Sequence, residues 1–218
     1  MEKKDILEAL QKARAETRKR NFNQSVDLII NLRGIDLKKT ENQLDFFLPL
    51  PHSTGRKVTM CALIGPELQE NAKQVANKII LADNFDQYTA NPKLIKKLSR
   101  DYDYFVGQAN IMPKIAATFG RVLGPRGKMP NPKAGCIVPP NANLKELSEK
   151  LQKIVRLKAK TSPVVHTMIG KQDMEDGKLA DNAVAIYKAV LEHIPNAEYN
   201  IRSVFIKLTM GKPAKVTR

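Results

Sequence analysis

The chain has 218 residues, of which 42% are hydrophobic and 27% charged, a balance typical of a globular protein that buries a core. Its 37 Lys and Arg residues against 22 Asp and Glu residues give a formal net charge of +15, so the expected partner is a polyanion, above all a nucleic acid. No stretch approaches the roughly 20 apolar residues that span a bilayer, and the N-terminus lacks the apolar segment of a signal peptide. We therefore expect a cytoplasmic protein with no membrane partner.

The N-terminal part of the sequence predicts one helix followed by two strands. Residues 3–20 place apolar side chains, among them Ile6 and Leu10, at the spacing of one helical face. Residues 25–32 and 44–48 predict strands, and each is followed by glycine or proline. These elements are too few to close a core by themselves.

The middle of the chain alternates between strand and helix patterns. The apolar run 58–64 is typical of a strand buried on both faces. Further strands are predicted at 78–81 and 102–106, with helices ending near 76, beginning at 91 and covering 111–119, and a Gly- and Pro-rich loop at 120–140. This alternation predicts a small parallel sheet covered by helices.

The C-terminal part supplies the elements that the N-terminal part lacks. It predicts helices at 144–154 and 179–193 and strands at 155–160, 164–169 and 201–209. The predicted fold class is therefore α/β with two domains. A split α+β domain comprises 1–58 plus 156–218, and a parallel α/β domain, 59–155, is inserted into it.

The sequence lacks the patterns of nucleotide and metal chemistry. Gly124-Pro-Arg-Gly-Lys128 has two residues between its glycines where a phosphate loop has four, and no dinucleotide fingerprint follows the run 58–64. Cys61, Cys136 and the three histidines are not spaced as metal ligands. We therefore expect that the protein is not an enzyme and that it holds no cofactor and no metal. A nucleic-acid-processing enzyme is an alternative for which the sequence offers no convincing base or metal site.

Two stretches are the most specific in the chain. Residues 120–135 combine four glycines, three prolines and the cations Arg121, Arg126, Lys128 and Lys133 in a segment without acidic residues. Residues 202–212 form a strand that ends at Thr209-Met-Gly211, where glycine allows a close backbone approach and methionine offers an adaptable apolar contact.

Together with Lys178-Leu-Ala-Asp-Asn182 and Arg202-Ser203, these stretches resemble the universal large-subunit ribosomal protein family L-one, in its archaeal form, essentially from end to end. The resemblance implies a Rossmann-like inserted domain and a structural protein of the large ribosomal subunit that is a monomer when free. It implies binding to the rRNA stalk beside the exit tRNA site, assistance in the release of deacylated tRNA from that site, and repression of translation through the protein's own mRNA leader.

The resemblance also implies a set of RNA-binding residues. By position they are Phe22, Ser25, Asp27, Ser203, Thr209, Met210 and Gly211, with Lys160, His166 and Lys171 as weaker candidates. The cations Arg121, Arg126, Lys128 and Lys133 form a secondary basic loop. Bacterial members often carry Lys, Thr and Glu at the positions of Asn21, Ser25 and Asp27, so this chain has one cation fewer and two shorter side chains there. A basic protein that binds RNA without sequence preference is the other alternative.

Overall fold

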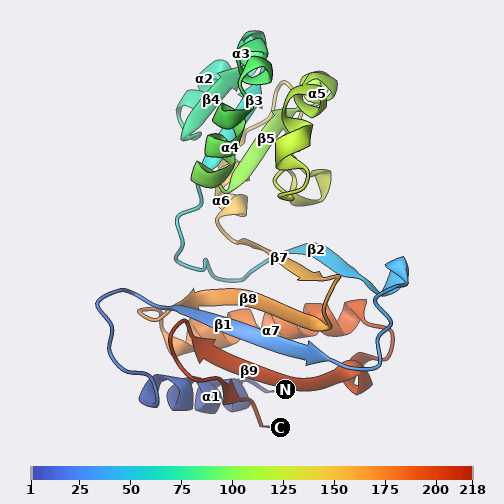
Figure 1. The fold of residues 1–218 in the computed structure, drawn as a ribbon. Helices are drawn as coiled ribbons and strands as arrows, with labels where there is room; N and C mark the ends of the chain where they lie inside the picture. The colour runs from blue at the N-terminus through green and yellow to red at the C-terminus, as the bar shows by residue number, and fades with distance from the viewer. Residues whose placement is uncertain (1, 218) are drawn as a thin grey trace. The chain divides into compact units, whose positions relative to one another are not determined.

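The computed structural model describes residues 2–217, which fold into two compact units (Figure 1). Unit 1 combines the two chain ends, Met1–Arg56 and Lys153–Arg218, and unit 2 is the intervening Lys57–Gln152. The sequence-based boundaries at 58/59 and 155/156 lie two and three residues further along the chain than these divisions. No helix within residues 2–217 is both long and apolar enough to cross a membrane.

The main sheet of unit 1 is antiparallel, with the strand order β10-β9-β1-β8. Its strands are β1 (Ser25–Leu32), β8 (Val164–Lys171), β9 (Ile201–Leu208) and β10 (Ala214–Lys215). Alternate residues of β1 are buried because successive side chains of a strand point to opposite faces. The sheet therefore has an inner face, which builds the core, and an outer face, which carries partly exposed side chains.

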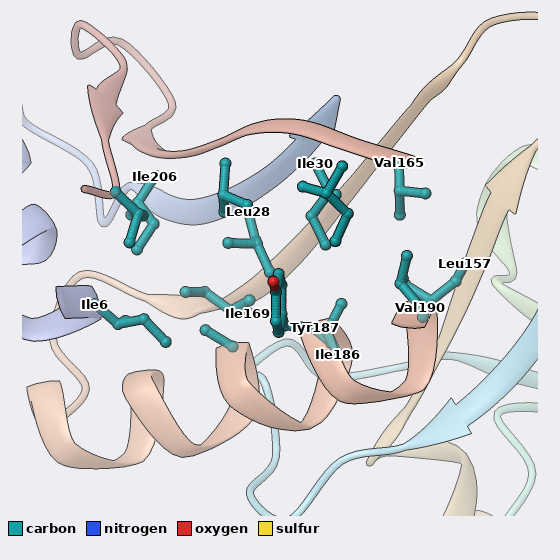
Figure 2. Packing of buried hydrophobic residues seen from close by; sticks show 14 of the residues in the cluster. Ile6, Leu28, Ile30, Leu157, Val165, Ile169, Ile186, Tyr187, Val190 and Ile206 are labelled. Carbon is teal, nitrogen blue, oxygen red and sulfur yellow. The ribbon is translucent and has the colours of Figure 1, made fainter. Parts of the chain in front are cut away.

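The inner face of this sheet packs on helices (Figure 2). Leu28 and Ile30 of β1 lie above Ile186 and Val190, and all four are fully buried. The remaining elements of unit 1 are α1 (Lys3–Ala15), α7 (Asp176–His193), the 3-10 helices η1 (Thr40–Asn42) and η6 (Ala197–Asn200), and the antiparallel ribbon of β2 (Leu44–Pro49) and β7 (Ile154–Ala159).

Unit 2 has a parallel sheet in the order β4-β3-β5-β6, as the strand and helix alternation predicted. Its strands are β3 (Met60–Ile64), β4 (Lys78–Leu81), β5 (Tyr104–Gln108) and β6 (Ile137–Val138). Its helices are α2 (Gln69–Lys73), α3 (Phe85–Ala90), α4 (Pro92–Asp101), α5 (Met112–Leu123) and α6 (Leu144–Leu151), with 3-10 turns η2 (Pro66–Leu68), η3 (Ala82–Asn84), η4 (Ala109–Ile111) and η5 (Pro132–Ala134).

Several predicted boundaries differ from the structure by a few residues, and two of these differences have a packing reason. The first helix ends at Ala15 rather than at residue 20, because no apolar side chain after Ala13 repeats the buried face of the helix. The loop expected from residue 120 begins later, because α5 continues to Leu123 and buries that side chain one turn beyond Phe119. Arg121 is consequently a helix residue and not part of the basic loop.

Asn182 joins α7 to two other segments of unit 1. It is fully buried, and its amide nitrogen donates to the carbonyl oxygens of Ile169 (2.9 Å) and His52 (3.1 Å). Its side-chain oxygen accepts from the backbone N–H of His52 at 3.0 Å. The bond to Ile169 is buried and the two bonds to His52 are partly buried, and a buried polar group without a partner is costly.

We predict that Asn182→Ala lowers the free energy of unfolding by roughly 2–4 kcal/mol, because it leaves one buried donor and two acceptors without a partner. Urea denaturation of the full chain measures this loss. Asp181→Asn is the matched control, since the neighbouring carboxylate is solvent-exposed and its ion pair with Lys3 lies at the surface. Equal losses in the two variants would contradict the assigned role of Asn182.

Candidate nucleic-acid interface

Five of the proposed RNA-binding residues lie at the start of β1 or at the end of β9. They are Phe22, Ser25, Thr209, Met210 and Gly211, and together they make up the terminal-strand site. The Ser25 N–H donates to Thr209 Oγ1 at 3.0 Å, and the Thr209 N–H donates to the Ser25 carbonyl oxygen at 3.0 Å. The antiparallel pairing of β1 and β9 thus joins positions 184 residues apart, and the Thr209 hydroxyl has a structural partner.

Two large apolar side chains of this site face solvent. Phe22 is 52% exposed and Met210 is 58% exposed. Water-exposed side chains of this kind offer contact area to a partner. The backbone of Met210 is nevertheless anchored, because Met210 lies between the Thr209 bonds and the Gly211 N–H, which donates to the Leu208 carbonyl oxygen at 2.9 Å.

Gln24 supports the site from inside, and sequence analysis missed it. Its side chain is fully buried, and its Oε1 accepts from the Met210 N–H at 3.0 Å. Its backbone oxygen accepts from the Gln172 N–H at 2.8 Å. The signal was present in the sequence, because Gln24 is in phase with the buried residues Val26 and Leu28 of β1.

Position 211 requires glycine because the end of β9 comes close to the end of α1. A Cβ atom at this position would collide with Thr17 Oγ1, just after α1, and would also touch the Leu208 side chain. Thr17 cannot turn away freely, because its hydroxyl donates to the Ala13 carbonyl oxygen at 2.6 Å. The glycine therefore lets the end of β9 pack against the end of the first helix.

The outer face of the sheet continues the polar surface along β1. His166 Nε2 lies 3.4 Å from Asp27 Oδ2, and Asn31 Nδ2 donates to Ser203 Oγ at 3.0 Å. Lys171 is paired in register with Ser25 and is partly buried. The structure therefore places the predicted residues Asp27 and Ser203 on the two strands of the terminal-strand site, and His166 and Lys171 on the neighbouring strand β8.

Lys160 is held by an ion pair on the β2–β7 ribbon. Its Nζ lies 2.8 Å from Asp45 Oδ2, and Arg156 donates to both oxygens of the same carboxylate at 2.7 and 2.8 Å. The hydrogen bond from Arg156, assisted by Lys160, holds the pKa of Asp45 well below its ordinary value of 3.8. Sequence analysis missed this cluster, since nothing in the pattern shows that residues 111 apart meet.

The secondary basic residues of unit 2 differ in whether their side chains are hydrogen-bonded to the protein or exposed to solvent. Arg126 donates to Ser99 Oγ and to the Lys96 carbonyl oxygen, and Lys128 Nζ donates to the Tyr102 carbonyl oxygen at 2.7 Å. These two cations therefore fasten their loop to the end of α4. Arg121 on α5 and Lys133 on η5 are exposed to solvent.

Cysteine thiols and clusters of metal-binding side chains are the groups that would indicate reactive chemistry in the described residues. Burial raises the pKa of the Cys61 thiol to about 12 and that of Cys136 to about 11, so neither is a thiolate near neutral pH. Within residues 2–217, no three His, Cys, Asp or Glu side chains gather in a way that could hold a metal ion. The polar groups of the terminal-strand site instead present a fixed pattern of donors and acceptors beside two exposed apolar side chains.

Comparison with known proteins gives one consistent result. Residues 11–212 match the model of the ribosomal protein L1p/L10e family. The chain is 38% identical to the "Large ribosomal subunit protein uL1" of Thermococcus kodakarensis, over 100% of this chain and 99% of that protein. The proteins of the same description from Methanothermococcus thermolithotrophicus and Pyrococcus horikoshii are 38% and 37% identical, covering 100% and 99% of this chain and 100% and 96% of their own lengths.

We predict that Gly211→Ala destabilises unit 1 by roughly 1–3 kcal/mol, because the added methyl group overlaps Thr17. The free energy of unfolding should be compared among Gly211→Ala, Thr17→Ala and the double variant. The double variant should lose less than the sum of the two single losses, because Thr17→Ala removes the colliding oxygen. Simple additivity would show that this contact is not the reason for glycine.

We also predict a pH-dependent contribution from Asp45. A carboxylate with a depressed pKa in the folded state stabilises the protein fully above its unfolded pKa and loses this contribution as the pH falls through the folded value. The difference in unfolding free energy between the wild type and Asp45→Asn should therefore be constant near neutral pH and shrink below about pH 4. A difference that grows on acidification would refute the ion-pair explanation.

Proposed function

The chain belongs to the ribosomal protein L1p/L10e family, and on this premise we propose that it binds large-subunit rRNA through its terminal-strand site. As a member of this family it is a structural, non-enzymatic protein of the large ribosomal subunit in the cytoplasm. The observation that carries the proposed site is the pair of exposed apolar side chains, Phe22 and Met210, of which Met210 lies on a backbone fixed by hydrogen bonds.

The physical chemistry of the site suits a folded RNA. Structured RNA is recognised through its shape, its 2′-hydroxyl groups and unstacked bases, which short polar groups on rigid strands can contact. Ser25, Asp27 and Ser203 are such groups, and His166 adds an exposed imidazole. The net charge of +15 supplies the salt-dependent attraction to phosphate that brings any RNA to the surface.

The proposed contacts are not all equal. Thr209 and Gly211 act by shaping the backbone. The Thr209 hydroxyl is hydrogen-bonded to Ser25, and Gly211 leaves room for the Thr17 side chain. Met210, Phe22 and the outward residues of β1, β8 and β9 then touch RNA directly. Lys160 contributes weakly, because its ammonium group is already held by Asp45.

We extend the proposal to the stalk of the large-subunit rRNA beside the exit tRNA site. There the protein would assist the release of deacylated tRNA, and Arg121 and Lys133 of unit 2 would make weaker RNA contacts. Free of the ribosome, the monomer would repress translation by binding its own mRNA leader. Both roles follow from the family resemblance, and one rigid site can serve two RNAs that present the same structure.

The test is binding of the full chain to a fragment of the rRNA stalk and to a scrambled duplex, over a series of salt concentrations. We predict that Met210→Asp weakens binding to the stalk fragment roughly a hundredfold, because a carboxylate at the centre of the site would face phosphate. Met210→Leu keeps the apolar contact and is the matched control. Equal affinity for both RNAs, unchanged by Met210→Asp, would leave only nonspecific electrostatic binding and overturn the proposal.

A further inference from the structure

Tyr199 is the most exposed large hydrophobic side chain in the described part of the protein, at 82% of its surface, and it lies outside the terminal-strand site. It belongs to η6, which leads directly into β9. The start of β9 is paired with the end of β1, so Tyr199 lies at the opposite end of these strands from Met210. Eight residues of β9 separate the two ends by about 25 Å.

The backbone that carries Tyr199 is tightly fixed. The Arg33 Nε donates to the Tyr199 carbonyl oxygen at 2.8 Å, and the Arg33 N–H donates to the Asn200 carbonyl oxygen at 2.7 Å. Asn200 is 3% exposed, and its side chain donates to the Arg33 carbonyl oxygen and accepts from the Asn196 N–H. The backbone beneath the exposed ring is thus ordered before binding, which lowers the entropic cost of a contact made there.

Arg202 is turned outward by a β-bulge next to this ring. Leu32 is paired with Ile201 and Asn31 with Ser203, so Arg202 is the extra residue of β9. Bulges redirect side chains in this way. Arg202 is exposed, and the following Ser203 shares the outer face with Asn31, to which it is hydrogen-bonded. The outer face of β1 and β9 therefore ends directly beside Arg202.

A hollow of about 340 Å³ lies beside Arg202. Its walls are residues 201–204 of β9 and residues 215–217 of the C-terminal segment. Lys215 and Arg202 supply two cations, Ser203 and Thr217 two hydroxyl groups, and no acidic residue lines it. This composition fits a phosphodiester with its ribose, because the cations match the charge and the hydroxyl groups can bond the sugar and phosphate oxygens.

We propose that Tyr199 stacks on an unpaired base of the bound RNA, while Arg202, Lys215 and the hollow that they line hold the RNA backbone close by. The inference rests on the proposed rRNA-binding function and adds a second contact at the far end of β9. An RNA occupant is favoured over a protein by the two cations of the hollow and by the continuity of the outer face with the terminal-strand site. Aromatic stacking accepts any base, and the position of the hollow determines which nucleotide of the RNA is held.

The chain contains no tryptophan, which provides a direct test. In Tyr199→Trp the indole is the only one in the protein, and a stacked base should quench its fluorescence on titration with the stalk rRNA fragment. Tyr199→Ala should weaken binding of this fragment roughly five- to 150-fold, the range for loss of one stacked base. Tyr199→Phe keeps the ring and should bind as the wild type does. Arg202→Ala should lower the salt slope of binding by about one.

The outcomes separate this inference from the proposed function. Failure of the wild-type chain to bind the rRNA fragment overturns both. Tight binding by the wild type, with unchanged affinity of Tyr199→Ala and no quenching in Tyr199→Trp, overturns only the stacking contact. Loss of affinity in Tyr199→Ala without quenching also overturns it, since the ring would then merely support the turn. Leu94→Ala, at a 42% exposed apolar residue of unit 2, controls for a general effect of removing surface side chains.

Discussion

The antiparallel pairing of β1 with β9 is the interaction on which the rest of the structure depends. It joins residues 25–32 to residues 201–208 and so makes one sheet from the two ends of the chain. Unit 2 must then be an insertion, and its connections follow β2 and precede β7, which are themselves paired up to Pro49 and Ile154. The same pairing places Ser25 beside Thr209, so the fold cannot close without assembling the terminal-strand site.

The two-residue period of β1 assigns each side chain to the core or to the surface. Val26, Leu28 and Ile30 face the helices and are fully buried, whereas Ser25 and Asp27 face outward. A slip of one residue would exchange the two sets, placing a carboxylate in the core and leucine in the binding surface. Correct register is thus enforced by the hydrophobic effect, and the precision of the site is a consequence of the stability of the core.

The apolar patterns along the sequence predicted most of the fold. The strands at 25–32 and 78–81 have the predicted bounds, because their apolar patterns continue to the last paired residue. The strand β10 was missed, since it has two residues and depends on β9 for its pairing. At the site, the family motif named residues such as Thr209 but not the bond to Ser25, and it could not show that Asp45 holds Lys160. Such contacts between distant segments follow from tertiary packing and leave no local periodicity.

Net charge alone does not explain where this protein binds RNA. Lys160, Arg126 and Lys128 were predicted from the sequence to contact RNA, yet each is bonded to protein oxygen atoms. The polar side chains on the outer face of β1 and β9, such as Ser25, Asp27 and Ser203, are instead short, so they lose little rotamer entropy when a partner binds. Long exposed cations attract any polyanion and are screened by salt, while a rigid array of small groups accepts one shape. The affinity that exposed cations provide and the selectivity that a rigid array of small groups provides are therefore separate properties of the molecule.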